Sequence, residues 1–211
     1  MKNTALMVPE DTPFYRFARI LCAVTIGATY RLHVEGAYNL PAKGPALLAV
    51  NHKNDLDPIF VGVSFRRPLR YFAKAELFRN AVLGWTVSSL GAIPVRRGES
   101  DRHALEAALA CLERGEALMV FPEGTRFGDE SIHEFQRGIG MLAVRSGAPV
   151  IPVAIKGSNA IFRDGRPGLP VVRLKAGPAV DLSDLQERRS AVYDVATERL
   201  HGVVEELYAS V

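Results

Sequence analysis

The sequence predicts a single α/β domain with a mostly parallel, twisted sheet flanked by helices, preceded by an amphipathic N-terminal helix. Short apolar runs alternate with helical patterns along the chain, which is typical of a parallel sheet with crossover helices. No internal repeat of fixed period occurs, which excludes solenoids and propellers. The 211 residues suit one domain with a sizeable core. We expect an N-terminal helix within residues 1–30 and the domain over residues 31–211.

Composition and charge narrow the class of protein further. Apolar residues make up 48% and charged residues 23%, which argues against extended disorder. Cys22 and Cys111 lie in apolar or helix-like surroundings, so we expect reduced thiols rather than a disulfide framework. Residues 1–100 hold 13 Lys and Arg against 7 Asp and Glu, and residues 101–211 hold 13 against 16. The basic half favours an anionic partner (a phosphate-bearing substrate, a lipid surface or nucleic acid), unless these charges only solvate the surface.

The expected N-terminal helix is apolar but interrupted by arginines. Residues 14–34 are mostly apolar, with Arg16, Arg19 and Arg31 among them. The uncharged stretch Ile20–Tyr30 has 11 residues, whereas about 20 are needed to cross a bilayer, so it is too short to span one. Two interpretations remain open: the helix lies in the headgroup region of a membrane, or it packs on the domain.

The remaining elements follow from apolar runs and turn residues. Residues 46–50 (ALLAV) are continuously apolar, as expected of a strand that is covered on both faces. Other strands are expected at 31–35, 69–73, 92–95, 117–121, 150–155 and 171–175, with helices clearest at 102–113 and 138–146. The closing segment predicts an amphipathic helix, whose stripe we interpret as core: Val192, Val195, Ala196, Leu200, Val203, Val204 and Leu207.

The densest polar cluster, residues 51–58 (NHKNDLDP), directly follows the apolar run 46–50. Open α/β sheets bind ligands beyond the carboxyl ends of their strands, so this is the expected place for chemistry. Asp57 and Pro58 predict a helix start, with Asp as N-cap and Pro at the first helical position. Neutral imidazole, with a reference pKa of about 6.5, can take a proton from a hydroxyl. In the turn, Asp57 could fix the His52 tautomer with one oxygen and cap the helix with the other.

Two alternatives to a catalytic His52–Asp57 pair remain. Asp57 could be only a helix cap and His52 an ordinary turn residue. His52, Asp55 and Asp57 could instead bind a metal, although no second His or Cys cluster completes a ligand shell, and we expect no metal. The sequence has no Gly-x-Ser-x-Gly elbow and no cysteine in a polar turn, so the base would act directly on a substrate hydroxyl. Phosphate-loop and Gly-x-Gly-x-x-Gly motifs are also missing, which disfavours nucleotide hydrolysis and hydride transfer.

Three further segments carry candidate binding residues. In residues 121–126 (FPEGTR), Gly124 permits close backbone approach, Thr125 offers a hydroxyl and Arg126 suits phosphate oxygens. Glu123 could accept hydrogen bonds from substrate hydroxyls or hold Arg126 in place. Alternatively, the whole segment is a structural turn without a binding role. Paired arginines that end a strand, Arg96 and Arg97, could bind a phosphomonoester, although such pairs are often only solvated surface. Pro152 lies in an apolar strand and predicts an edge or a bulge.

In this order and spacing, the segments resemble the glycerolipid acyltransferase family typified by 1-acyl-glycerol-3-phosphate acyltransferase. The resemblance spans residues 30–180 and rests on His-x-x-x-x-Asp together with Phe-Pro-Glu-Gly-Thr-Arg; the segment Tyr71–Trp85 also resembles the family. It implies that His52 is the general base and that Asp57 orients it. It further implies that Arg96 or Arg97 and the turn Glu123–Arg126 receive the glycerol phosphate, with Pro152 near the acyl donor. The family often has a lysine where Gln136 stands.

The resemblance also implies the reaction and the partners. The expected activity is transfer of a fatty acyl group from acyl-CoA or acyl carrier protein, with no other cofactor, to 1-acyl-glycerol-3-phosphate, giving phosphatidate for phospholipid biosynthesis. Glycerol 3-phosphate or another lyso-lipid as acceptor, and thioester hydrolysis, are the alternatives. We expect docking to an anionic membrane surface through the N-terminal helix and residues 65–70, and no nucleic-acid binding. The expected location is peripheral or monotopic, on the cytoplasmic face of the cell membrane.

Overall fold

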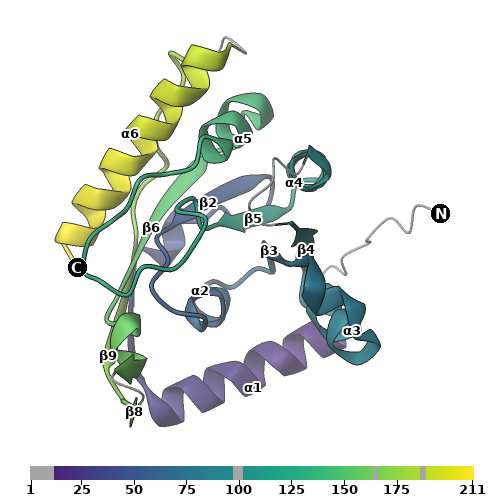
Figure 1. Cartoon of the computed structure of the whole chain (residues 1–211), viewed down its shortest axis with the longest axis vertical. Helices are drawn as coiled ribbons and strands as arrows, with labels where there is room; N and C mark the ends of the chain where they lie inside the picture. The colour runs from purple at the N-terminus through teal and green to yellow at the C-terminus, as the bar shows by residue number, and fades with distance from the viewer. Residues whose placement is uncertain (1–11, 97–101, 164–165, 186–188) are drawn as a thin grey trace.

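The computed structural model describes residues 12–96, 102–163, 166–185 and 189–211, and it confirms the predicted α/β class (Figure 1). Seven strands form one sheet in the order β1–β9–β6–β2–β5–β3–β4. Neighbouring strands are parallel except β6 and β9, which are antiparallel. The strands are β1 (Arg31–Glu35), β2 (Ala46–Val50), β3 (Leu69–Lys74), β4 (Ala92–Val95), β5 (Ala117–Val120), β6 (Val150–Lys156) and β9 (Val171–Ala176). Two short strands, β7 (Phe162–Arg163) and β8 (Arg166–Pro167), form a separate antiparallel pair.

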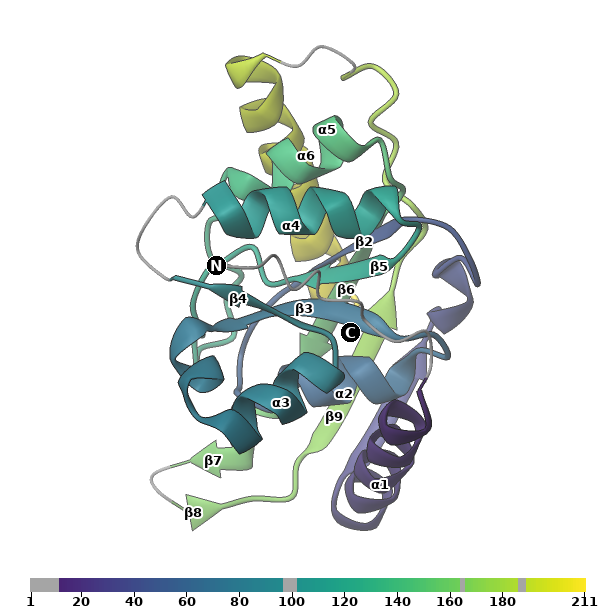
Figure 2. The same cartoon turned by 90° about the vertical axis from the view of Figure 1, so that its right-hand side faces the viewer.

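Helices cover both faces of the sheet, as Figures 1 and 2 show. One face packs against α4 (Arg102–Glu113), α5 (Gly138–Ser146) and α6 (Ser190–Ala209). The other face packs against α1 (Pro13–Thr29) and α2 (Asp57–Ser64), and α3 (Ala81–Ser89) lies beside β4. The helices predicted at 102–113 and 138–146 are confirmed.

The central strand β2 shows why a continuous apolar run is needed at this position. Its five residues are all fully buried, as predicted for ALLAV. Leu47 and Ala49 belong to the core under α4, α5 and α6, whereas Leu48 and Val50 belong to the core under α2. Because side chains alternate along a strand, a polar residue at any of these positions would enter one of the two cores.

The register of the central strands places two loops side by side at the carboxyl ends of these strands. β2 runs parallel to β5 on one side and to β6 on the other. Ala49 is opposite Val120 of β5, and Val50 is opposite Val153 of β6. The residues that follow β2 and β5 therefore leave the sheet side by side, which is the arrangement expected for a site in an open α/β sheet.

The N-terminal helix α1 packs on the domain with one face and exposes apolar side chains on another. Thr12 caps it by accepting the backbone N–H of Tyr15 at 3.2 Å, and Pro13 takes the first helical position. Tyr15 and Ile26 are buried, and Arg19 donates to the carbonyl of Phe65 at 2.9 Å. The exposed apolar residues are Phe17 (64%), Ile20 (60%), Leu21 (53%) and Val24 (64%). No helix among the described residues is both long enough and apolar enough to cross a membrane.

The closing helix α6 follows the predicted stripe only in part. Ala196, Leu200 and Val204 are fully buried, as expected. Val195 is 45% exposed, and Tyr208, which was not part of the predicted stripe, is 6% exposed. These buried residues recur every four positions, and the last of them is Tyr208. Because its side chain is buried, the Tyr208 hydroxyl needs a hydrogen-bond partner.

The expectation that Pro152 marks an edge strand is wrong. β6 lies between β2 and β9 in the middle of the sheet. The antiparallel register shifts by one residue, from Val153 opposite Ala176 to Val150 opposite Val180. Pro152 lies inside this irregularity, where its missing N–H breaks no regular ladder, so the alternative expectation of a bulge fits the pairing.

Residues 65–70, which we expected to take part in membrane docking, are mostly buried or bound within the fold, and Arg66 is the exposed one. Phe65 and Leu69 are buried. Arg70 is 4% exposed and forms an ion pair with Glu116, with Nε and Oε2 2.7 Å apart. Arg67 donates to three backbone carbonyls, those of Pro41, Gly44 and Gly115, so it fastens loops at the opposite end of the strands from the site.

Both cysteines are free, as predicted. Cys111 is fully buried in the core under α4, and burial raises its pKa to about 12, so the thiol stays protonated. Cys22 on α1 is only partly buried.

Candidate active site

The structure brings His52 and Asp57 together at the end of β2. His52 Nδ1 lies 3.0 Å from Asp57 Oδ2. His52 is 5% exposed and Asp57 is fully buried. The imidazole also stacks on the ring of Phe121, the first residue after β5, with centroids 4.1 Å apart. With Nδ1 on the carboxylate, Nε2 is the ring nitrogen that can take a proton from a substrate hydroxyl.

The preceding residue, Asn51, locks this loop to the sheet. Its side-chain amide donates to the carbonyl of Ile155 at 2.9 Å, and its side-chain oxygen accepts the N–H of Ile155 at 2.7 Å. Asn51 thus continues the ladder between β2 and β6 after β2 has ended. This paired contact fixes the direction in which the chain leaves the sheet toward His52.

Asp57 faces backward into the turn, so the expectation that its second oxygen caps α2 is wrong. Oδ2 accepts the backbone N–H groups of Lys53 at 2.6 Å and Asn54 at 2.7 Å, in addition to its contact with His52. α2 begins at Asp57 itself, and Leu56 before it makes no side-chain cap bond. Asp57 Oδ1 is buried and has no hydrogen-bond partner among the described residues. The carboxylate therefore orders the 52–57 turn and orients the imidazole with the same oxygen.

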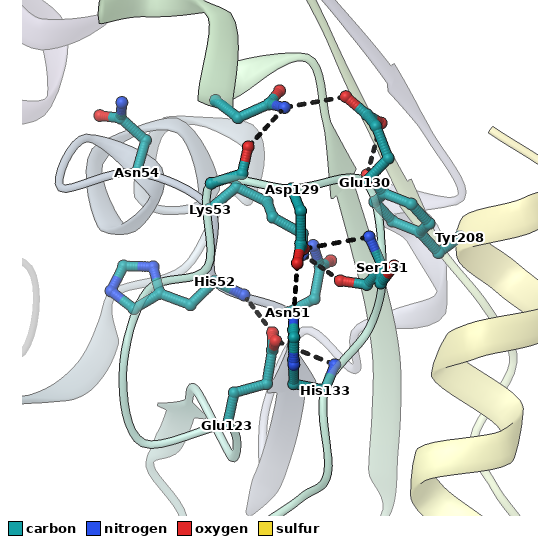
Figure 3. A network of polar contacts seen from close by, with 12 residues as sticks. Asn51, His52, Lys53, Asn54, Glu123, Asp129, Glu130, Ser131, His133 and Tyr208 are labelled. Atoms are coloured by element: carbon teal, nitrogen blue, oxygen red, sulfur yellow. Dashed lines mark hydrogen bonds and ion pairs between the residues drawn. The ribbon is translucent and has the colours of Figure 1, made fainter.

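The turn after β5 holds His52 by its main chain. Glu123 Oε1 accepts the backbone N–H of His52 at 2.7 Å, and Oε2 accepts that of His133 at 3.2 Å (Figure 3). The carbonyl of His52 accepts the N–H of Phe127 at 3.1 Å. Glu123 is 3% exposed. The expectation that Glu123 holds Arg126 is wrong, because both of its oxygens face backbone N–H groups.

Arg126 lies at the rim of the site beside Asp55. Its guanidinium donates to Asp55 Oδ2 and is 34% exposed, whereas the Asp55 side chain is 79% exposed. The pair comes from the two loops that the sheet brings side by side. Among the described residues no three His, Cys, Asp or Glu side chains gather in a group that could hold a metal ion.

Gly124 and Thr125 lie exposed beside Arg126. Gly124 has φ of 74°, and its N–H closes a turn onto the carbonyl of Phe121 at 3.1 Å. A Cβ at Gly124 would come within 3.2 Å of the Gln136 side chain. The N–H of Gln136 donates to the carbonyl of Pro122 at 2.7 Å. Gln136, the position where the family often has a lysine, therefore packs behind this turn.

Two of the predicted binding positions are not next to His52. Arg96 is exposed and follows β4, which is three strands from β2, or about 14 Å at a spacing of about 4.8 Å per strand. Arg97 lies outside the described residues. Pro152 is opposite Ala49 inside the sheet and is buried on the α6 face, so the structure does not bring it to the His52 site.

An apolar pocket of about 100 Å³, which the sequence did not predict, lies between α1 and α2. Pro58, the residue after Asp57, lines this pocket together with Tyr71 and Met119. Burial raises the pKa of Tyr71 to about 12, so this wall stays uncharged. Helices and strands far apart in the chain supply the lining, which explains why no local pattern signals the pocket.

Comparisons with known proteins agree with this geometry. The family model described as acyltransferase matches residues 31–156. The crystal structure of the 1-acyl-sn-glycerophosphate acyltransferase of Thermotoga maritima is similar, with a TM-score of 0.74 and 28% sequence identity over 92% of this chain and 80% of that chain.

Curated relatives carry the same activity in their names. A chloroplastic 1-acyl-sn-glycerol-3-phosphate acyltransferase of Arabidopsis thaliana is 29% identical over 78% of this chain and 47% of its own length. The enzyme of that name in Pseudomonas aeruginosa is 31% identical over 78% of this chain and 64% of its own length, and that of Bacillus subtilis is 26% identical over 88% and 94%. The chain spans about half the length of the first two plant relatives it matches. It belongs to the acyltransferase family.

Proposed function

We propose that this protein is an O-acyltransferase that moves a fatty acyl group from acyl-CoA or acyl carrier protein to the free hydroxyl of 1-acyl-glycerol-3-phosphate, giving phosphatidate for phospholipid biosynthesis. The observation that carries the proposal is the contact of His52 Nδ1 with Asp57 Oδ2 at 3.0 Å, with the Arg126 turn on the neighbouring loop. The relatives named for this activity support the choice of acceptor.

Among the described residues no serine, threonine or cysteine side chain bonds to His52, so the base acts directly on the acceptor hydroxyl. His52 Nε2 removes the proton of the acceptor hydroxyl while that oxygen forms a bond to the thioester carbonyl carbon. The carbonyl becomes a tetrahedral oxyanion, which collapses and breaks the carbon–sulfur bond. The thiolate of the carrier leaves and takes the proton back from the imidazolium. Asp57 stabilises the imidazolium and keeps Nδ1 facing away from the substrate.

The charge and position of Arg126 favour a substrate that carries a phosphate. Guanidinium groups match phosphate oxygens through two parallel hydrogen bonds. Among the described residues Arg126 forms an ion pair with the exposed Asp55, a weak contact that a phosphate can replace. Arg96 follows β4, three strands from β2, so Arg126, which follows the neighbouring strand β5, is the nearer cation for this role.

The apolar pocket beside α2 supports a fatty acyl chain. Its walls are mostly carbon, and Pro58, the residue after Asp57, lines it. An acyl chain bound in this pocket would therefore have its thioester carbonyl toward the His52–Asp57 pair. An acyl chain there would be covered by α1, the helix that also carries the exposed apolar residues.

We also propose that α1 and α3 rest on an anionic membrane surface, in a peripheral or monotopic position on the cytoplasmic face of the cell membrane. α1 exposes four apolar side chains, and α3 adds Val82 (76%), Leu83 (42%) and Trp85 (60%). Phe14 of α1 and Trp85 of α3 touch, with ring centroids 4.8 Å apart, so the two helices meet, and their exposed apolar residues make up the proposed docking surface. Such a surface, larger than scattered single residues, marks an interaction site.

One assay tests the proposed reaction. Purified protein is incubated with one acyl thioester and a panel of acceptors: 1-acyl-glycerol-3-phosphate, glycerol 3-phosphate and other lyso-lipids. Products are identified by mass. We expect phosphatidate and a free thiol in equal amounts, with little thiol released when no acceptor is present. Thiol release that does not depend on acceptor would instead identify a thioester hydrolase and overturn the proposal.

A further inference from the structure

Lys53, the residue after the proposed base, is a buried cation. Its side chain has no exposed surface, and its ammonium donates to the carbonyl of Ser131 and lies 3.5 Å from Asp129 Oδ1. Its backbone N–H donates to Asp57 Oδ2 at 2.6 Å. Because a buried ammonium without partners is costly, Lys53 and these groups have to stay together. Lys53 thus connects the Asp57 carboxylate to residues 127–133, which we call the 127–133 loop.

The 127–133 loop in turn holds the peptide of His52. Phe127 donates its N–H to the carbonyl of His52, and its ring stacks on that of His133, with centroids 3.6 Å apart. The N–H of His133 donates to Glu123, which accepts the N–H of His52 with its other oxygen. His133 Nε2 also lies 2.8 Å from Asp129 Oδ2, the carboxylate beside Lys53. A displacement of this loop is therefore transmitted to both sides of the His52 peptide.

Tyr208 on α6 fastens the middle of the loop. Its hydroxyl donates to Glu130 Oε2 at 2.9 Å, and Figure 3 shows it reaching from the helix to that carboxylate. Glu130 Oε1 accepts the side-chain amide of Asn159 at 2.8 Å. The ammonium groups of Lys53 and Lys156 lie 5.7 and 5.0 Å from the centroid of the Tyr208 ring, within cation–π range.

Through these contacts, α6 is connected to the 127–133 loop, and the loop is connected to the backbone of His52. The family model ends at residue 156, so α6 lies outside the matched segment. In Figure 3 the side chain of Lys53 runs away from the imidazole of His52, toward the loop. We propose that Lys53 and Tyr208 are positioning residues, which hold the 127–133 loop and through it His52 in the geometry that acyl transfer requires.

The proposal rests on the proposed function, and its physical basis is the sensitivity of proton transfer to distance. A displacement of about 1 Å from a change remote from the chemistry can cost about a hundredfold in rate. Neither side chain has to touch the substrate for this effect. A residue that acts in this way lowers kcat and leaves the KM for the acceptor nearly unchanged.

The first test compares two tyrosines of the same helix. Tyr208→Phe removes only the hydroxyl that Glu130 accepts, and Tyr193→Phe makes the same chemical change near the start of α6. We expect Tyr208→Phe to lower kcat by about tenfold or more, with the KM for lysophosphatidate changed less than about twofold. Tyr193→Phe is expected to keep both constants. Equal kcat in Tyr208→Phe and wild type would overturn the positioning role of Tyr208.

The second test separates positioning from bulk stability. Lys53→Arg keeps a cation under the loop, whereas Lys53→Met keeps the length of the side chain but removes the charge. We expect Lys53→Arg to retain more kcat than Lys53→Met at a temperature where both are folded by circular dichroism. If both variants keep the kcat of wild type, or if Lys53→Met unfolds and Tyr208→Phe keeps full kcat, the proposal fails.

Amide hydrogen exchange of the loop supplies a readout that does not depend on activity. We expect Tyr208→Phe to increase exchange at the N–H groups of Phe127 and His133, while Tyr193→Phe leaves them unchanged. A wild-type protein that acylates no acceptor would disprove the proposed function. Unchanged exchange and unchanged kcat in Tyr208→Phe, with an active wild type, would disprove only the positioning role.

Discussion

Glu123 accepts the backbone N–H of His52 at 2.7 Å, so the turn after β5 holds the proposed base by its main chain rather than by its ring. The two motifs are therefore one unit: the second fixes the peptide of His52, and Asp57 fixes its imidazole. This leaves the exposed part of the Phe121–Arg126 turn, and Arg126 above all, as the part that can meet a substrate.

Replacement of Glu123 by Ala is expected to impair both folding and turnover. It leaves the N–H groups of His52 and His133 without their acceptor, and a buried polar group without a partner costs about 1–3 kcal/mol. We expect the free energy of unfolding, measured by urea titration, to fall by about 2 kcal/mol or more. Glu123→Gln keeps one acceptor oxygen, so its free energy of unfolding and its turnover are expected to lie between those of wild type and of Glu123→Ala. A Glu123→Ala variant as stable and active as wild type would show that this carboxylate does not hold the loop.

Asp57→Asn tests the role of the carboxylate in setting the tautomer. The amide has nearly the same size, but its nitrogen can face His52 Nδ1 and leave the proton on Nε2. We expect kcat to fall by about 10³-fold or more, as for orienting carboxylates in other His-based sites, with a smaller change in KM. The measurement is steady-state kinetics with lysophosphatidate. A loss of less than tenfold would mean that Asp57 serves the turn and not the imidazole.

Asp55→Asn is expected to improve the use of a phosphorylated acceptor. It releases Arg126 from an exposed ion pair, and such pairs are worth up to about 1 kcal/mol, so the KM should fall by about two- to fivefold. Thermal stability should not change. Arg126→Ala is expected to raise the KM by about tenfold or more, because it removes a charge-assisted hydrogen bond. Identical KM values in all three proteins would exclude a phosphate contact at Arg126.

Vesicle binding is expected to depend on the exposed rings of α1 and α3. Phe17 is 64% exposed and Trp85 is 60% exposed. Replacing either by Ser removes a side chain whose burial contributes about 1.5–3 kcal/mol, so the affinity for anionic vesicles should fall by about tenfold or more. Tyr38→Ser is the control outside these two helices, since Tyr38 is 87% exposed in the short segment Ala37–Asn39. Wild-type binding should weaken with salt, and equal binding by all variants would contradict this docking surface.

The ion pair between Arg70 and Glu116 gives a pH dependence of stability. Burial opposes ionisation of Glu116, but hydrogen bonds from Arg70 and Arg114 outweigh it and lower its pKa from 4.5 to about 2. Since the folded-state pKa lies below the unfolded value, this stabilisation is present above pH 4.5 and is lost as the pH falls toward 2. Glu116→Gln should therefore be less stable than wild type at pH 6 and match it near pH 2. A difference in unfolding free energy that stays constant over this range would contradict the assignment.

The elements with the strongest local patterns were predicted well from the sequence. The buried run ALLAV and the helix at 102–113 have the expected bounds, because a two-sided core and a helical apolar stripe each leave a short-range pattern. The bulge at Pro152 was also expected, but its position in the sheet was not. Strand order depends on which runs pair across the chain, and a single sequence does not show this.

The residues of the site whose chemical types and positions suggest a function were predicted from the sequence. His52 and Asp57 were identified because of their place after a buried strand, and the structure brings them together. The partners of Glu123 were missed, since a carboxylate beside an arginine in sequence suggests a pair, whereas the fold places backbone N–H groups closer. Lys53 and Tyr208 were missed for a related reason: the burial of a lysine and the reach of a tyrosine 155 positions away depend on tertiary packing alone.

The most direct measurement of the central claim is the turnover of His52→Ala with lysophosphatidate and an acyl thioester, in a protein shown by thermal unfolding to be folded. Removal of a general base is expected to lower kcat by about 10²- to 10⁴-fold, so the rate of phosphatidate formation should fall by the same factor. Formation of phosphatidate by the folded variant at a rate close to that of wild type would contradict the claim that His52 takes the proton of the acceptor.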